Sequence, residues 1–183
     1  SWEEYEEQEG DLVIEIDPGM SFGTGNHGTT KACLQFLDEV ATGEEKTFMD
    51  MGCGSGILSM GASKLGYKSI EAFDYDPDAV RIAGENLVLA KCPGVKVFQQ
   101  DLSEYVAGTK FDVVVANILA VVLKANASRI VAALKEGSES RLVLSGILHE
   151  QYGEIKEEFT KVGLKEVQCK EIDEWSSGLF AWK

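Results

Sequence analysis

Short apolar runs alternate with amphipathic segments along most of the chain. Helices are predicted where apolar side chains recur on one side, as Cys33, Leu34, Leu37 and Val40 do. The predicted helices span residues 27–40, 57–66, 77–90, 120–137 and 151–163. The shorter apolar runs predict strands at residues 11–17, 46–51, 68–76, 95–101, 111–118, 140–147, 164–170 and 177–182.

The order of these elements predicts the fold class. Strands that alternate with helices of ten to fifteen residues indicate right-handed crossovers and a mostly parallel, doubly wound α/β sheet. The unbroken apolar run "FDVVVANI" (111–118) is typical of a central strand that is buried on both faces. No helix separates the last two predicted strands, so we expect them to form an antiparallel hairpin at the sheet edge. Gly66 and Pro77 are expected to end one helix and open the next.

Composition narrows the class of protein. The chain of 183 residues is long enough to bury the core of a single domain. Its net charge of −14 repels nucleic-acid phosphates and anionic membranes, and it favours basic proteins or cationic small molecules as partners. An acidic surface that only confers solubility is the alternative. The sequence also contains no apolar run of the roughly 18 residues that a membrane span needs.

Four scattered cysteines bear on the cellular compartment. They form no CxxC pair and have no histidine nearby in the sequence, so we expect neither a zinc site nor a disulfide framework. This pattern fits a reducing cytoplasm, which is the predicted location. The chain begins Ser-Trp-Glu without a methionine, so we expect it to be part of a longer chain.

The segment "DMGCGSGIL" lies between a predicted strand and helix, where doubly wound sheets bind their ligands. Gly52, Gly54 and Gly56 permit positive φ angles and a close approach to the backbone. The G-x-G-x-G spacing differs from the G-x-G-x-x-G pattern that binds a dinucleotide pyrophosphate. Asp50, directly before the turn, would repel that group and suits an ammonium or sulfonium cation. S-adenosylmethionine carries such cations together with a carboxylate for the helix N-terminus; a tight turn without a ligand is the alternative.

Acidic residues also follow the next two strands. Asp74, at the tip of the second predicted core strand, is placed to accept hydrogen bonds from both ribose hydroxyls. Asp76 competes for that role, although its position before Pro77 favours an N-cap. Asp101 could accept from an adenine amino group while Leu102 packs on the ring, with a capping role for Asp101 as the alternative.

Several motifs together resemble a known family. "DMGCGSGIL", "FDYDP", "VVANIL" and "LSGIL" follow the order and spacing of the class I S-adenosylmethionine-dependent methyltransferases, which have a Rossmann-like sheet. The loop "DPGMSFGTGNHGTT" (17–30) resembles the signature loop of the PrmA family, whose members methylate a protein of the large ribosomal subunit. This similarity extends from "SWE" at the first residues to "EWSSGLFAWK" at the last.

The resemblance implies a cofactor and a substrate. The cofactor is S-adenosylmethionine, and the substrate amino groups are lysine side chains or the N-terminus of a basic ribosomal protein, with no nucleic acid and no membrane involved. The residues that the resemblance assigns to cofactor binding are Phe22, Gly23, Thr24, Gly25, Thr30, Asp50, Gly52, Gly54, Asp74 and Asn117. The loop at 17–30 would close over the cofactor as a lid.

The family's N-terminal substrate-recognition domain has no counterpart in these residues. We therefore expect residues 1–183 to form one S-adenosylmethionine-binding domain, in which residues 1–16 are a linker and short strand. Removal of the N-terminal domain and a natural stand-alone enzyme with another substrate, either a small molecule or a protein, both remain open.

The resemblance places Asn117 beside the transferred methyl. The side-chain carbonyl of Asn117 could accept a hydrogen bond from a neutral amine and aim its lone pair, whereas a strand-end cap is the alternative. His27 is a candidate general base, although a histidine at a helix start is at least as often structural.

Other classes of protein fit the sequence less well. A nucleic-acid methyltransferase would have an aromatic residue and prolines after the asparagine, and "NILA" has neither. A non-enzymatic cofactor-binding module would not need the intact "VANI" element, and a nicotinamide-dependent dehydrogenase is disfavoured by Asp50 and the glycine spacing.

Overall fold

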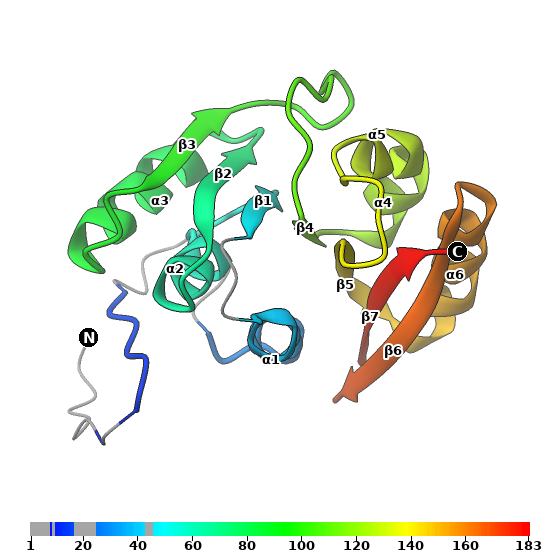
Figure 1. The fold of residues 1–183 in the computed structure, drawn as a ribbon, viewed down its shortest axis with the longest axis horizontal. Coiled ribbons are helices and arrows are strands. Elements are labelled where there is room, and N and C mark those ends of the chain that lie inside the picture. Colours follow the sequence, from blue (N-terminus) through cyan, green and yellow to red (C-terminus); the bar gives the residue numbers. More distant parts are fainter. Residues whose placement is uncertain (1–7, 9, 17–24, 43–45) are drawn as a thin grey trace.

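The computed structural model describes residues 8, 10–16, 25–42 and 46–183, and in this part of the chain seven strands form one sheet (Figure 1). The strands are β1 (Thr47–Met51), β2 (Lys68–Asp74), β3 (Val95–Gln99), β4 (Val113–Asn117), β5 (Arg141–Leu148), β6 (Leu164–Ile172) and β7 (Trp175–Trp182). Their spatial order is β3-β2-β1-β4-β5-β7-β6. The first five pair in parallel, and β7 is antiparallel to both β5 and β6. The predicted α/β class and antiparallel C-terminal hairpin are confirmed.

Six helices lie in the described ranges, one before β1 and the others between the strands. They are α1 (Gly28–Val40), α2 (Ile57–Lys64), α3 (Pro77–Leu89), α4 (Ala120–Ala125), α5 (Ala127–Ala132) and α6 (His149–Lys161). As predicted, Gly66 ends α2 with φ +90°, and Tyr67 N–H donates to the Ala62 carbonyl in a Schellman-type C-cap. Each described helix is too short or too polar to cross a lipid bilayer.

The helices cover the two faces of the sheet. One apolar cluster joins α1, α2 and α3 to the sheet through residues such as Phe36, Phe48 and Val115. The other joins α4, α5 and α6 to the opposite face through residues such as Leu123 and Phe159. Because β4 is apolar at every position from Val113 to Ala116, it is buried on both faces and forms the centre of the sheet.

The strand predicted at residues 11–17 is wrong for the described residues 11–16, which form no strand; Asp17 lies outside the described residues. The alternating apolar residues Ile14 and Ile16 pack instead against the cluster of α1 and α2. The alternating pattern therefore indicates an extended segment that is buried on one side. Here that side is buried against helices and not by a partner strand.

The single helix predicted at 120–137 is also wrong, because it divides at Asn126 into α4 and α5 and ends well before Gly137. Asn126 leaves helical geometry at φ −119° and ψ 16°, and its side-chain amide donates to the Val122 carbonyl at 3.0 Å. Beyond α5, the Phe111 N–H donates to the Ala133 carbonyl at 2.8 Å. Residues 133–135 therefore pair with the segment before β4, and this pairing prevents them from continuing α5.

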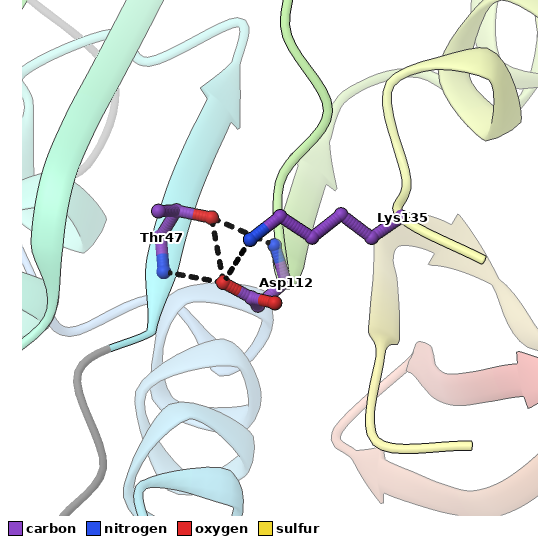
Figure 2. Close-up of polar contacts among 3 residues, drawn as sticks. All are labelled: Thr47, Asp112 and Lys135. Carbon is purple, nitrogen blue, oxygen red and sulfur yellow. Dashed lines mark hydrogen bonds and ion pairs between the residues drawn. The ribbon is translucent and has the colours of Figure 1, made fainter. Parts of the chain in front are cut away.

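A polar cluster joins the start of β1 to the residue before β4, at the end of the sheet opposite the glycine-rich turn (Figure 2). Oδ2 of Asp112 accepts from the Thr47 N–H at 2.8 Å, from Thr47 Oγ1 at 2.7 Å and from Lys135 Nζ at 2.8 Å. Burial raises the pKa of Asp112, but hydrogen bonds from Lys135 and Thr47 outweigh it, so the pKa lies below its ordinary value. The cluster holds the two central strands together at that end.

Candidate functional site

The glycine turn (residues 52–56) links β1 to α2 where the carboxyl ends of the central strands meet. Gly52, Gly54 and Gly56 all have left-handed φ angles, of +77°, +52° and +82°. The N–H groups of Gly52 and Cys53 donate to the Phe73 carbonyl at 2.9 and 3.0 Å, which ties the turn to β2. The strand order reverses between β1 and β4, so the turn lies where doubly wound sheets bind ligands.

Ile118 fixes the position of the segment that follows β4. A Cβ at Gly52 would overlap Cγ2 of Ile118, and a Cβ at Gly146 would lie 2.5 Å from the Ile118 carbonyl oxygen. Both glycines have positive φ angles. The backbone after Asn117 is therefore held between the glycine turn and β5, with no room for a side chain at either glycine.

Asp50 is a buried carboxylate with one engaged oxygen. Its side chain is 1% exposed, and Oδ2 accepts a hydrogen bond from Ser59 Oγ at 2.7 Å. Oδ1 has no partner among the described residues. Burial raises the pKa of Asp50 to about 6; the charge of Asp74 adds to this effect, and the Ser59 hydrogen bond opposes it. A cationic group would both pair with Oδ1 and relieve the buried charge.

Asp74 and Asp76 have different roles. Oδ2 of Asp74 accepts from the Gly54 N–H at 3.0 Å, and its Oδ1 accepts from the Asp76 N–H at 3.1 Å. Asp74 therefore holds the glycine turn against the start of α3, and its carboxylate oxygens keep acceptor capacity for a ligand. Asp76 accepts from the Asp78 N–H at 2.9 Å and caps α3, as its position before Pro77 predicts.

A cavity of about 230 Å³ lies at the carboxyl ends of β2, β3 and β4, and Asp101 and Leu102 line it together with Gly52 and Tyr75. Leu102 is buried. Asp101 is exposed, and its Oδ1 accepts from the Ser103 N–H at 2.7 Å, which lowers the pKa of Asp101. The cavity is mainly apolar, which suits a flat ring. The hydrogen bond from Ser103 to Asp101, however, is the local contact expected if Asp101 has a capping role.

Asn117 is the last residue of β4 and lies beside Ser145 of β5 in the sheet. Its alternate-residue neighbours Val113 and Val115 face the cluster of α1 and α2, so Asn117 lies on that same face at the carboxyl end. Its Oδ1 is buried and has no partner among the described residues. The structure therefore gives no support for a capping role of this side chain.

The N-terminus of α1 carries the end of the loop at 17–30. His27 caps the helix: its Nδ1 accepts from the Thr29 N–H at 3.4 Å and contacts Thr29 Oγ1 at 2.8 Å, and its ring centroid is 5.0 Å from that of Trp175. These contacts favour the structural role. A Cβ at Gly25 would lie 3.2 Å from Ile57 Cδ1, so the end of the loop reaches the first residue of α2. Of the other predicted loop contacts, Thr30 is buried in α1, whereas Phe22, Gly23 and Thr24 lie outside the described residues.

Three buried side-chain atoms lack a hydrogen-bond partner in the described part of the chain. They are Thr30 Oγ1, Asp50 Oδ1 and Asn117 Oδ1. Buried polar atoms without partners are rare in native proteins, and each costs about 1–3 kcal/mol. All three belong to residues expected to contact a cofactor. They come from β4 and from the two elements β1 and α1, which both pack against β4. This arrangement fits a ligand that presents polar and charged groups.

Two residues that shape the site were not identified from the sequence. Ser59 bonds Asp50, and its only sequence signal is its place in the first turn of the helix after the glycines. Ile118 fills the space beside Gly52 and lines the cavity, but in the sequence it is one more apolar residue after a strand.

Comparison with known proteins places the chain in a family. The family model described as ribosomal protein L11 methyltransferase (PrmA) matches residues 1–181. A ribosomal protein L11 methyltransferase of Caldanaerobacter subterraneus subsp. tengcongensis is 44% identical over 185 residues, which cover 100% of this chain and 57% of that protein. One of Geotalea daltonii is 43% identical and is covered to 58% of its length. The chain thus spans less than two thirds of the curated relatives that it matches.

A solved structure shows the same fold. The ribosomal protein L11 methylase of Lactobacillus delbrueckii subsp. bulgaricus superposes with a TM-score of 0.88 at 31% identity, covering 100% of this chain and 92% of that one. A precorrin-6y C5,15-methyltransferase of Geobacter metallireducens has a TM-score of 0.73 at 18% identity, which shows the fold alone. With this fold, the glycine turn and a family match over nearly the whole length, the chain belongs to the ribosomal protein L11 methyltransferase (PrmA) family.

Proposed function

We propose that this chain is the catalytic domain of an S-adenosylmethionine-dependent N-methyltransferase that acts on amino groups of ribosomal protein L11. The observation that carries the proposal is the set of three unpartnered buried atoms on Thr30, Asp50 and Asn117. They accompany a glycine turn in which a Cβ at Gly52 would overlap Ile118. Family membership supports the substrate, because the matched relatives are named for it.

The residues present fit this cofactor. Asp50 would pair through Oδ1 with a cationic group, and the Asp74 carboxylate would accept from the ribose hydroxyls. The cavity lined by Leu102 and Tyr75 would take the adenine ring, with Asp101 near its amino group. When bound, the cofactor supplies a methyl group on a sulfonium, which a neutral amine can attack in line.

Asn117 would orient the amine. Its Oδ1 is free to accept a hydrogen bond from a neutral amino group, which would aim the nitrogen lone pair. The resemblance also assigns cofactor contacts to Phe22, Gly23, Thr24 and Gly25, of which only Gly25 lies among the described residues. Residues 1–183 would form one S-adenosylmethionine-binding domain. A cytoplasmic location would fit the four cysteines, which are all free.

Calorimetric titration and a methyl-transfer assay test the proposal. The chain should bind S-adenosylmethionine and its demethylated product but not NAD. It should transfer methyl groups to ribosomal protein L11 poorly, and better when the region that precedes the matched segment in a full-length relative is joined to it. Asn117→Ala should abolish transfer and leave cofactor affinity nearly unchanged, because its amide contacts the amine.

Asn126→Ala serves as the matched control, since the amide of that side chain lies between α4 and α5, where it donates to the Val122 carbonyl. NAD binding in place of S-adenosylmethionine would reject the cofactor. Strong transfer to one small amine, with none to L11 even when the region preceding Ser1 in a full-length relative is joined to the chain, would instead indicate a small-molecule enzyme.

A further inference from the structure

We propose that Ser59 is a positioning residue for the cofactor, a step that rests on the proposed function. Its hydroxyl holds Asp50 by one carboxylate oxygen and leaves the other oxygen, in ionised form, for the cofactor's cationic group. Ser59 itself would not touch the cofactor.

The geometry of the pair carries the proposal. Ser59 Oγ lies 2.7 Å from Asp50 Oδ2, and the two side chains are 0% and 1% exposed. A carboxylate rotates as a unit, so a hydrogen bond to Oδ2 also fixes where Oδ1 lies. Oδ1 is the oxygen that has no partner among the described residues. Ser59 therefore assigns one oxygen to the protein and keeps the other for a ligand.

The surroundings of Asp50 give this hydrogen bond an electrostatic role as well. The titratable groups that face Asp50 are Asp74 from β2, Cys33 from α1 and Cys53 from the glycine turn. The packed segment of β4, Val113–Asn117, carries no ionisable side chain. No ion pair joins Asp50 to a described residue, and the groups that lower its pKa are the hydroxyl and the backbone N–H of Ser59, the hydroxyl having the larger effect.

Loss of the hydroxyl should make cofactor affinity more dependent on pH. Burial raises the pKa of Asp50 to about 6, and the Ser59 hydrogen bond opposes that rise. In Ser59→Ala the pKa should increase further, so Asp50 is protonated at a higher pH and no longer pairs with a cation. An Asp50 pKa of about 6 in the unaltered protein predicts affinity about twofold weaker at pH 6 than at pH 8. In Ser59→Ala the same change in pH should weaken binding about tenfold.

Calorimetric titration with S-adenosylmethionine at these two pH values tests the proposal. The matched control is Ser63→Ala, the same substitution one turn further along α2. Titration of the ligand's own amino group is common to all the proteins, so differences between them report on the protein. Ser59→Thr keeps the hydroxyl and should restore the original pH dependence, and thermal unfolding checks that each variant is folded.

The outcomes separate the two proposals. A steep pH dependence in Ser59→Ala, absent in Ser63→Ala and reversed in Ser59→Thr, supports the positioning role. If Ser59→Ala has the same pH dependence as Ser63→Ala, or if Ser59→Thr is as pH-sensitive as Ser59→Ala, the role is rejected while cofactor binding stands. If the unaltered protein binds no S-adenosylmethionine at either pH, the proposed function itself fails.

Discussion

Replacing Asp50 by asparagine should stabilise the cofactor-free protein while weakening cofactor binding. The buried carboxylate titrates at about 6 instead of 3.8, which corresponds to about 3 kcal/mol of destabilisation at neutral pH. Asparagine removes this charge, but its amide leaves a buried polar group without a partner, which costs about 1–2 kcal/mol. The net gain should be about 1–2 kcal/mol, which raises Tm by about 2–8 °C in a domain of this size.

The pH dependence gives the prediction its sign. Because the folded-state pKa of Asp50 is raised, the folded protein binds more protons than the unfolded chain between pH 3.8 and about 6. The destabilisation therefore grows as pH rises through this range and is constant above it. Roughly half of the destabilisation of about 3 kcal/mol remains at pH 5, and the cost of the buried amide offsets it. The advantage of Asp50→Asn should therefore be full at about pH 8 and nearly absent at about pH 5. Urea unfolding of the cofactor-free proteins at the two pH values measures it.

Asp101→Asn is a control of opposite sign, since a hydrogen bond from Ser103 lowers the pKa of Asp101 and no stabilisation should follow. The affinity of Asp50→Asn for S-adenosylmethionine should fall by about 1.5–3 kcal/mol, the usual worth of a hydrogen bond to a charged group. The reasoning would be refuted if Asp50→Asn were less stable than the unaltered protein at pH 8, or if its gain in unfolding free energy were equal at both pH values. Either result would mean that the buried charge of Asp50 does not destabilise the cofactor-free protein.

Two further substitutions test the acidic residues around the sheet. Asp74→Ala should weaken S-adenosylmethionine binding by about 1–3 kcal/mol in a calorimetric titration, because it removes a ribose acceptor and the acceptor of the Gly54 N–H; unchanged affinity would move the ribose role to Asp76. Asp112→Ala should lower the free energy of unfolding by about 1–2 kcal/mol at neutral pH, allowing for the partial exposure of Lys135. Since the pKa of Asp112 is lowered, this difference should vanish as the pH falls through that pKa, and its persistence at low pH would contradict the ion-pair account.

Local sequence rules determined most of the elements and the place of the site. The glycine spacing after a buried strand, the cap at Asp76 and the C-cap at Gly66 depend on a few adjacent residues, and the structure has all three. The missing helix between the last two strands likewise predicted their antiparallel pairing, because a short turn cannot carry a parallel crossover.

Tertiary contacts decided the rest. The apolar alternation at residues 11–16 did not reveal that Ile14 and Ile16 would pack on helices, since burial without a partner strand leaves the same pattern. The end of the helix after α5, well before Gly137, depends on Phe111, which is distant in sequence and whose N–H donates to the Ala133 carbonyl. The hydrogen bond between Ser59 and Asp50, and the oxygen that it leaves unpartnered, exist only once α2 packs on β1. Residue types and their order thus determine which local structures form, whereas which buried atoms obtain partners depends on packing between distant segments.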